Sequence, residues 1–392
     1  MNINTTTSPD ERARLLDDVD RFCRALRPVE DRCYLERRFN DQLVPLAREH
    51  GLLGMHVPAE YGGRGADAAT YALALARIGH EGTGVRTFFS GHSSIGQGPI
   101  LAAGNAEQRG RLLPPTCRGE RICAFALTEP QAGSDPKSLR ATYRLEGDSY
   151  ILNGEKYLIS NGTIADLVVT FARPEGGGRI GAFVVAADAT GFEAEELGPK
   201  VGNPTADTAR IALKDCPVPV ADRLGAEGDG LRVAMGALVG GRLSVAAGCL
   251  GVIEDCLAEA LAFAKGRHQH GKPIAKHQLV QAHLAEIELA RATTESLVLR
   301  AAQAKAAAES DPSLHDTADH LAALAKWHAA RAACDAADRA VQVFGGRGFL
   351  EENRPGRHYR DARVCRLYEG TDEILTLKVA AKLLGKEYEA FQ

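Results

Sequence analysis

Cys123-Ala-Phe-Ala-Leu-Thr-Glu-Pro-Gln-Ala-Gly-Ser-Asp135 lies where the pattern of the chain changes from helical to β. Pro and Gly interrupt regular structure here, so the stretch is predicted to be a loop that exposes backbone amides and the hydroxyls of Thr128 and Ser134. Such a loop can offer hydrogen bonds to the edge of a flat polar ring. By itself it is equally typical of a capped turn, because Thr, Ser and Asp often bond to nearby backbone.

Helical patterns precede this loop. Ser8-Pro9-Asp10-Glu11 has the composition of a helix start, with a capping residue followed by proline in the first turn. Apolar residues then recur at helical spacing, and residues 69–78 repeat the helical pattern. The apolar residues of the first helix are Leu15, Val19, Phe22 and Leu26.

Short β-prone runs replace the helical pattern between about residues 121 and 224. Asn153-Gly154 separates two of these runs and predicts a hairpin turn. One GxGxxG pattern is formed by Gly176, Gly178 and Gly181, but Ala-Phe-Val-Val follows it, which predicts a strand. A dinucleotide site would need a helix at that point, so a hairpin turn is expected instead. The four runs are 150–152, 156–160, 167–172 and 182–187.

From Gly230 onward the chain is helical again. The Ala-rich stretches 285–308 and 317–343 are long enough to pack side by side, and Asp311-Pro312-Ser313 separates them. The expected fold class is α+β, in three domains. These are an N-terminal helical domain over residues 1–119, a central β-barrel-like domain over residues 120–226, and a C-terminal four-helix bundle over residues 227–392.

Composition narrows the classes of function. The net charge is −4 and no basic run occurs, so nucleic acid is not expected as a partner. The nine cysteines form no CxxC pair and the twelve histidines show no metal-ligand spacing, which favours a reducing compartment and no metal site. The N-terminus lacks the pattern of a signal peptide, and no apolar run is expected to reach the roughly 20 residues of a membrane span. A cytoplasmic location is expected.

Two further groups of motifs accompany the first loop. One is Asn153-Gly-Glu-Lys-Tyr-Leu-Ile-Ser-Asn-Gly162, and the other combines Gln342-Val-Phe-Gly-Gly346, Arg360-Asp361-Ala362 and Leu367-Tyr-Glu-Gly-Thr371. In order and spacing, the three groups resemble the acyl-CoA dehydrogenase family over nearly the whole chain. The resemblance implies that family's fold, FAD as cofactor, and dehydrogenation of an acyl-CoA to the trans-2-enoyl-CoA.

The resemblance implies that Glu369 is the catalytic base. It would take the α-proton while the β-hydrogen leaves as hydride to flavin N5, and its own amide N–H would help to stabilise the carbonyl oxygen. Judged alone, Glu369 would be an ordinary surface glutamate. Gly370 permits close approach of the backbone to a ligand, and Thr371 can reach a cofactor. Some relatives carry the base on an earlier helix, at a position that Gly241 occupies here.

The resemblance also implies sets of binding residues. Arg267, Gly271 and Gln278 match an RxxxGxxxxxxQ pattern that reaches the cofactor of a neighbouring subunit, so a homo-oligomer, by precedent a tetramer, is expected. An electron-transferring flavoprotein is the expected electron acceptor. The substrate residues implied are Ser134, Val239, Arg242 and Gly370. The FAD residues implied are Phe125, Leu127, Thr128, Gly133, Ser134, Leu158, Ile159, Ser160, Arg267, His270, Gln278, Gln342, Val343, Gly345, Gly346, Thr371 and Glu373.

Three positions depart from the commonest family pattern. Leu158 replaces a tryptophan against the flavin, and His270 replaces a phenylalanine in the contact between subunits. Val239 replaces an aspartate in the region that holds the carrier moiety, which leaves an acyl-carrier-protein thioester open as the substrate. A flavin oxidase or monooxygenase on the same fold, and a non-catalytic flavin-binding scaffold, also remain open.

Overall fold

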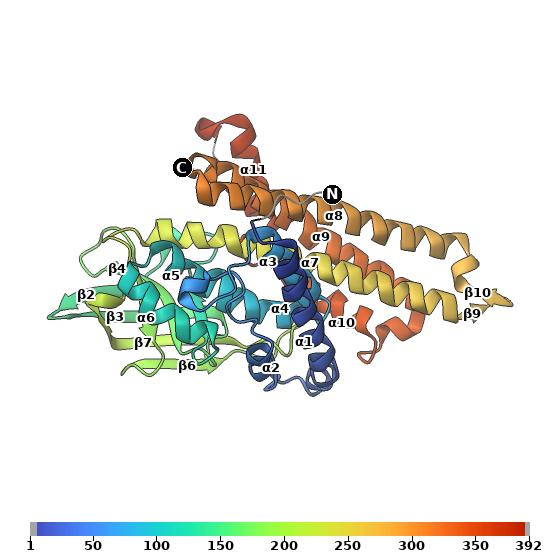
Figure 1. Cartoon of the computed structure of the whole chain (residues 1–392), viewed down its shortest axis with the longest axis horizontal. Helices are drawn as coiled ribbons and strands as arrows, with labels where there is room; N and C mark the ends of the chain where they lie inside the picture. Colours follow the sequence, from blue (N-terminus) through green and yellow to red (C-terminus); the bar gives the residue numbers. More distant parts are fainter. Residues whose placement is uncertain (1–5, 389–392) are drawn as a thin grey trace.

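The computed structural model describes residues 6–388 and begins with a helical region (Figure 1). Ser8 caps α1, where its side chain and that of Glu11 form a capping box, and Pro9 opens the helix, so the predicted start is confirmed. A π-helical segment, η2, follows α4 directly. The elements of this region are α1 (Pro9–Glu36), α2 (Leu43–Glu49), η1 (Ala59–Tyr61), α3 (Ala68–Gly79), α4 (Thr83–Phe89), η2 (Ser90–Gln97), α5 (Gly98–Ala103) and α6 (Ala106–Cys117).

An eight-stranded sheet follows, in the order β6-β7-β3-β2-β4-β5-β8, with β1 added in parallel beside β4. Its inner faces enclose an apolar cluster in which Tyr143, Tyr150 and Phe183 meet edge to face. The strands are β1 (Cys123–Ala126), β2 (Thr142–Glu146), β3 (Ser149–Ser160), β4 (Leu167–Pro174), β5 (Gly181–Ala186), β6 (Phe192–Glu196), β7 (Thr208–Pro219) and β8 (Arg223–Leu224). Short 3-10 turns η3 (Pro136–Ser138) and η4 (Val220–Asp222) join them.

The hairpin predicted at Asn153-Gly154 is wrong. Strand β3 continues through both residues, and its register with β7 shifts between Leu152 and Gly154, so the pair forms a β-bulge. The hairpin turn between β2 and β3 lies earlier, where Gly147 has a φ of 57°. Bulges and tight turns favour the same residues, because both require backbone conformations that Asn and Gly tolerate.

The GxGxxG segment is a turn between two antiparallel strands, as predicted. Strands β4 and β5 pair across it, and Gly177 and Gly178 take positive φ values of 83° and 132°. No helix follows Gly181, which instead opens β5. The segment therefore lacks the helix N-terminus that a dinucleotide pyrophosphate requires.

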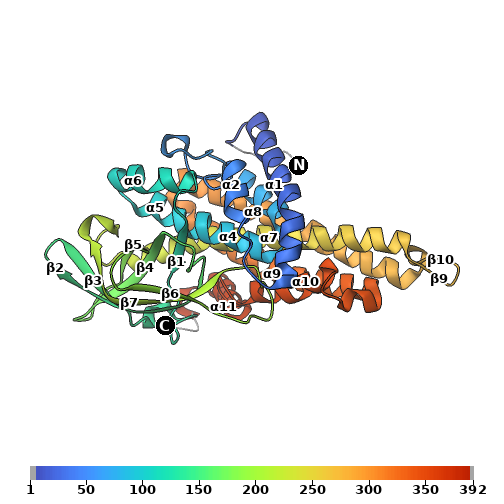
Figure 2. The ribbon, with the colours of Figure 1, turned by 90° about the horizontal axis from the view of Figure 1, so that it is seen from below.

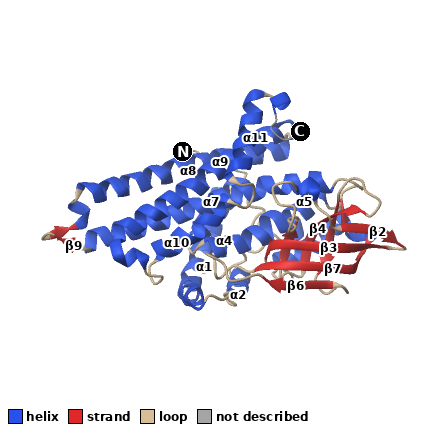
Figure 3. Ribbon diagram, turned by 180° about the vertical axis from the view of Figure 1, so that it is seen from behind, coloured by secondary structure: helices blue, strands red, loops and turns tan. Residues whose placement is uncertain are grey.

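Long helices form the rest of the chain and extend away from the sheet (Figures 1 and 3). The break predicted at residues 311–313 is confirmed by a 3-10 turn between α8 and α9. The elements are α7 (Gly230–Gly266), β9 (His268–Gln269), β10 (Lys272–Pro273), η5 (Ile274–Lys276), α8 (Gln278–Ser310), η6 (Pro312–Leu314), α9 (His315–Phe344), η7 (Gly345–Phe349), α10 (Arg354–Asp361), η8 (Ala362–Arg366), α11 (Asp372–Leu384) and η9 (Lys386–Tyr388).

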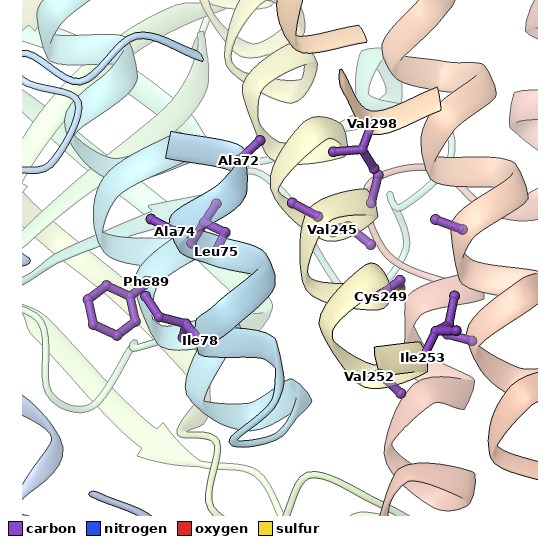
Figure 4. Close-up of a cluster of buried hydrophobic side chains, with 14 of the residues drawn as sticks. Ala72, Ala74, Leu75, Ile78, Phe89, Val245, Cys249, Val252, Ile253 and Val298 are labelled. Atoms are coloured by element: carbon purple, nitrogen blue, oxygen red, sulfur yellow. The ribbon is translucent and has the colours of Figure 1, made fainter. Parts of the chain in front are cut away.

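Helix α7 is the central element of the molecule. Its apolar side chains meet those of α3 on one side and α8 on another, as with Leu75, Val245 and Val298 (Figure 4). In residues 6–388 it is the one helix long and apolar enough to cross a membrane, contrary to the expectation that no such run exists. Because 78% of that apolar window is buried inside the fold, the window is accounted for by the core.

Glycines allow α3 and α7 to cross closely. A Cβ atom at Gly79 would lie 2.5 Å from the carbonyl oxygen of Gly248, and one at Gly251 would collide with the carbonyl oxygen of Ala76. Backbone atoms cannot move aside as a flexible side chain can, so any side chain at these positions forces the helices apart.

We expect Gly251→Ala to lower the free energy of unfolding by about 1–3 kcal/mol, the usual effect of overpacking a close-packed interior. Gly110→Ala on α6 is the matched control, since its added Cβ would meet nothing within 4 Å. The control should leave stability unchanged or raise it slightly, because alanine favours helix. Thermal and urea unfolding of both variants would measure this, and equal loss in both would contradict the account.

Candidate active site

A strained turn presents Glu369. It lies between η8 and α11, and Glu369 and Gly370 take positive φ values of 56° and 94°. A glutamate in this conformation is uncommon and costs on the order of 1–3 kcal/mol unless its surroundings enforce it. The next residue, Thr371, caps α11 by accepting a hydrogen bond from the Ile374 amide at 3.3 Å. The turn is thus held by the helix that follows it.

The carboxylate of Glu369 packs against bare backbone. A Cβ atom at Gly241 on α7 would lie 2.5 Å from both carboxylate oxygens, so a side chain there would displace the carboxylate from its present position. Positions 369 and 241, which the family resemblance offers as alternative places for the base, are therefore neighbours in space. Oε2 of Glu369 is shielded from solvent and has no hydrogen-bond partner in the described chain.

Burial raises the pKa of the Glu369 carboxyl to about 7, while the charges of Arg242, Lys326 and Arg86 act to lower it. A group with this pKa can take and release a proton near neutral pH. Among the hydrogen bonds of residues 6–388, none is donated by the amide N–H of Glu369, which leaves that donor available to a carbonyl oxygen. One residue thus offers both a base and an oxyanion donor.

Arg242 holds the turn from α7. Its Nε donates to the carbonyl oxygen of Glu369 at 3.2 Å, and its Nη1 donates to Asp319 Oδ1 on α9 at 2.6 Å. Sequence reasoning placed Arg242 among the substrate residues, and the structure places its buried side chain under the catalytic turn. Two other implied substrate residues are half-buried: Val239, three residues before Arg242, and Gly370, next to Glu369. Ser134 is exposed on the first loop.

A buried ion pair joins the first two sequence motifs. Lys156 on β3 is fully buried and donates to Glu129 Oε1 at 2.7 Å, while Glu129 also accepts from the amides of Arg140 and Ala141 at 2.6 and 3.0 Å. Burial lowers the pKa of Lys156 to about 8 against the opposing charge of Glu129. The Tyr157 amide also donates to the Thr128 carbonyl at 2.9 Å. The first loop is therefore tied to the end of β3.

The end of β3 approaches the π-helical segment η2. A Cβ atom at Gly91 would lie 3.6 Å from Cβ of Ser160 and 2.8 Å from Nδ2 of Asn161. Leu158 has a φ of 59° and is 58% exposed, so it offers an apolar surface on the same strand as Ser160, next to Tyr157, whose amide bonds to the Thr128 carbonyl. Such a mixture of an apolar platform and hydroxyls fits a flat ring with a polar edge.

The structure places the remaining implied FAD residues elsewhere. Arg267, His270 and Gln278 surround the β9–β10 hairpin, at the end of the molecule opposite the sheet (Figures 1 and 2), and all three are exposed. Phe344 stacks on Phe263 with ring centroids 4.2 Å apart, which brings the end of α9 to the end of α7. The exposed Gln342, Gly345 and Gly346 therefore lie toward this same distal end.

Other implied residues have buried side chains. Phe125, Leu127, Ile159 and Val343 belong to the core, so only their backbone is free to meet a ligand. Gly133 is exposed in the first loop, and Glu373 is exposed in the first turn of α11. Thr371 uses its hydroxyl to cap α11. Among the described residues no group of three His, Cys, Asp or Glu side chains is arranged to hold a metal, and all nine cysteines are free.

Comparison with known proteins shows the family. The family models of the acyl-CoA dehydrogenase N-terminal, middle and C-terminal domains match residues 9–120, 124–216 and 228–384. The chain belongs to the acyl-CoA dehydrogenase family. It is 39% identical to an acyl-CoA dehydrogenase of Bacillus subtilis over 353 residues, covering 88% of this chain and 90% of that protein.

Solved structures of acyl-CoA dehydrogenase fold are equally similar. Butyryl-CoA dehydrogenase from Megasphaera elsdenii superposes with a TM-score of 0.91 at 32% identity, covering 97% of this chain and 99% of that one. A prolyl acyl carrier protein oxidase superposes with a TM-score of 0.90 at 30% identity, covering 97% of this chain and 100% of that one. Members of the family are FAD-dependent oxidoreductases.

Sequence reasoning missed several residues of this acyl-CoA dehydrogenase site. Glu129 and Lys156 lie within quoted motifs, yet their pairing joins segments 27 residues apart and needs the sheet to bring them together. Arg86 and Lys326, which bond to the catalytic turn, lie in helices far from it in sequence. The sequence offered one sign of their role: each is a charged residue within an otherwise apolar stretch of a helix.

We expect Gly241→Ala to retain FAD and lower the rate of flavin reduction by about 100-fold, because displacing a reacting group by roughly 1 Å has that effect. Gly236→Ala, on the same helix with nothing within 4 Å of its added Cβ, should keep the wild-type rate. Anaerobic stopped-flow reduction of both variants would measure this. A fully active Gly241→Ala would show that the carboxylate does not rest on this backbone during the reaction.

Proposed function

We propose that the chain catalyses the FAD-dependent α,β-dehydrogenation of an acyl thioester, with acyl-CoA as the first candidate substrate and Glu369 as the base. The observation that carries the proposal is the shielded, unpartnered Oε2 of Glu369, on a carboxyl with a pKa of about 7. A surface glutamate would be solvated and would titrate near 4.3. A shielded carboxylate oxygen without a partner is costly, and catalysis gives it a role.

The residues of the chain divide the chemistry. Glu369 takes the proton from the α-carbon, and its free amide N–H donates to the thioester carbonyl oxygen as negative charge grows there. Arg242 keeps the turn in place through the Glu369 carbonyl. Bound FAD supplies the acceptor for the β-hydrogen and the two electrons that leave the substrate. Thr128, Ser134 and Ser160 would hold the polar edge of its ring, and Leu158 would lie against it.

The FAD site is shared between subunits in this proposal. The ring residues lie near the sheet and the catalytic turn, whereas Arg267, Gln278, Gln342, Gly345 and Gly346 lie at the distal end of the same chain (Figure 1). One extended dinucleotide then takes its ring contacts from one chain and its phosphate contacts from another. The arginine fork suits the pyrophosphate.

A second surface supports a homo-oligomer, for which we propose a tetramer. A groove of about 630 Å³ runs between α8 and α9 and contains the apolar side chains of Leu289 and Trp327. Its lining also carries both signs of charge, in Glu286 and Asp335 on one hand and Arg331 and Arg339 on the other. A patch with both signs can pair with a rotated copy of itself, as two-fold interfaces require.

Val239 favours an acyl carrier protein thioester as the second candidate substrate. It stands where many relatives have an aspartate, and the similar prolyl acyl carrier protein oxidase acts on a carrier-bound group. The proposed electron acceptor is an electron-transferring flavoprotein, with oxygen as the alternative that an oxidase would use. The proposal also keeps the three domains at residues 1–119, 120–226 and 227–392, and a cytoplasmic location.

Glu369→Gln is expected to keep bound FAD and to lose flavin reduction by at least about 10⁴-fold, since an amide cannot take the α-proton. Anaerobic reduction by a panel of short and branched acyl groups, each on coenzyme A and on a carrier protein, would measure this for wild type and variant. Oxygen consumption with and without an artificial acceptor separates the dehydrogenase from the oxidase. Rapid reduction of the Gln variant, or no reduction of wild-type FAD by any thioester, would refute the proposal.

Arg267→Ala is expected to weaken FAD retention by roughly tenfold or more, because a bidentate contact to phosphate is lost. Lys265→Ala, which removes another exposed cation near the end of α7, is the matched control and should retain FAD. Gel filtration with absorbance at 450 nm would measure both flavin content and assembly. Equal flavin content in the two variants would exclude a pyrophosphate role for Arg267.

A further inference from the structure

Five Lys or Arg side chains are buried among the described residues: Arg86, Lys156, Arg242, Lys326 and Arg357. Three of them pair with carboxylates, since Lys156 bonds to Glu129, Arg242 to Asp319 and Arg357 to Asp31, at 2.7, 2.6 and 2.5 Å. Arg86 and Lys326 have no carboxylate within ion-pair distance in residues 6–388. A buried charge is costly unless it is paired, so these two cations need an explanation.

Arg86 bonds to the residue before Glu369. It is 2% exposed on α4, its Nη2 donates to the hydroxyl of Tyr368, and its guanidinium lies over the Tyr368 ring at 5.3 Å from the centroid. Helix α7 is shaped to admit it, because a Cβ atom at Gly248 would lie 2.6 Å from Cγ of Arg86. The fold thus keeps open the space that this cation occupies.

Lys326 bonds to the residue after Glu369. It is fully buried on α9, and its Nζ donates to the carbonyl oxygen of Gly370 at 2.5 Å. With Arg242 on the Glu369 carbonyl, three cations from three helices hold three consecutive residues, 368 to 370. Only Arg242 of the three is neutralised by a carboxylate, Asp319, which Lys378 of α11 also contacts.

We propose that Arg86 and Lys326 are positioning residues, which hold the two neighbours of Glu369. They also place positive charge near the Glu369 carboxylate, whose Oε2 has no hydrogen-bond partner of its own. The inference rests on the proposed role of Glu369 as base. Inside a protein a charge acts over longer distances than in water, so two cations one residue away favour an ionised carboxylate. Their hydrogen bonds also hold Glu369 in its left-handed backbone conformation, which a glutamate adopts only when its surroundings enforce it.

Other charged groups face this turn and bear on its titration. From η8, Cys365 Sγ lies 3.2 Å from the Tyr368 hydroxyl, and a hydrogen bond from Cys249 of α7 holds the pKa of the Cys365 thiol below its ordinary value. From α11, Asp372 is bonded to Arg366 at 2.7 Å, outside the turn. A Cys365 thiolate would compete with Glu369 for the charge of Arg86, so this thiol must be tested separately.

The test is the pH dependence of anaerobic flavin reduction in the FAD-loaded protein. For wild type, the rate should rise with pH through about 7, because the base acts only when ionised. In Arg86→Met and in Lys326→Met, the midpoint should move up by about one pH unit each, so that the loss of rate relative to wild type is roughly tenfold larger at pH 6.5 than at pH 9. Arg86→Lys keeps the charge and should keep the midpoint, even if its rate falls.

Two controls complete the design. Arg300→Met removes an exposed cation of α8 and should leave the midpoint in place, and Cys365→Ser should not move it upward. A pH-independent loss of rate in both Met variants would overturn the proposal, as would an upward shift in Cys365→Ser. The proposal would also fail if Arg86→Met left the midpoint unmoved and lost activity only towards substrates whose acyl group ends in a carboxylate. Arg86 would then bind substrate. If wild-type FAD is reduced by no thioester, the proposed function itself fails instead.

Discussion

The contact between the Glu369 carboxylate and the bare backbone of Gly241 is the constraint on which the rest of the site depends. It works because α7 carries glycine at three places with different neighbours: Gly241 under the base, Gly248 beside Arg86, and Gly251 against α3. A separation of seven residues, from Gly241 to Gly248, spans about two helical turns, so both glycines face the same side of α7. One central helix thus receives Glu369 and Arg86 on one side and the crossing helix α3 nearby.

Local patterns in the sequence predicted the helical zones well, because capping residues and apolar spacing act within a few residues of each other. Ser8 and Pro9 are an example, as is the break at Pro312. Asn153-Gly154 was misread because a bulge and a hairpin favour the same two residues, and only the pairing partner on β7 distinguishes them. Pairing is a property of the sheet and is not encoded in the dipeptide.

The family motif predicts Glu369 and the binding residues, but it cannot predict contacts that depend on distant packing, such as those of Arg86 and Lys326. Glu369 was identified from its motif, but its unpartnered oxygen and its raised pKa follow from burial, which requires the fold. The raised pKa of Glu369 also determines how its ionisation affects stability. Because the folded chain holds this proton more tightly than the unfolded chain, ionisation of Glu369 lowers the free energy of unfolding as pH rises from about 4.3 towards 7. The cations at Arg86 and Lys326 limit that cost.

The β9–β10 hairpin has a genetic consequence, given the proposed shared FAD site. Arg267 lies beside the β9–β10 hairpin at one end of the molecule, whereas Glu369 precedes α11, nearer the sheet (Figure 2). A defect at either position would therefore damage a different half of a shared site. Consider a cell with one allele damaged at the hairpin and another damaged at the turn. Mixed oligomers could still contain some intact sites, formed by the undamaged turn of one subunit and the undamaged hairpin of the other. Two null alleles would then complement each other, which subunits with self-contained sites could not do.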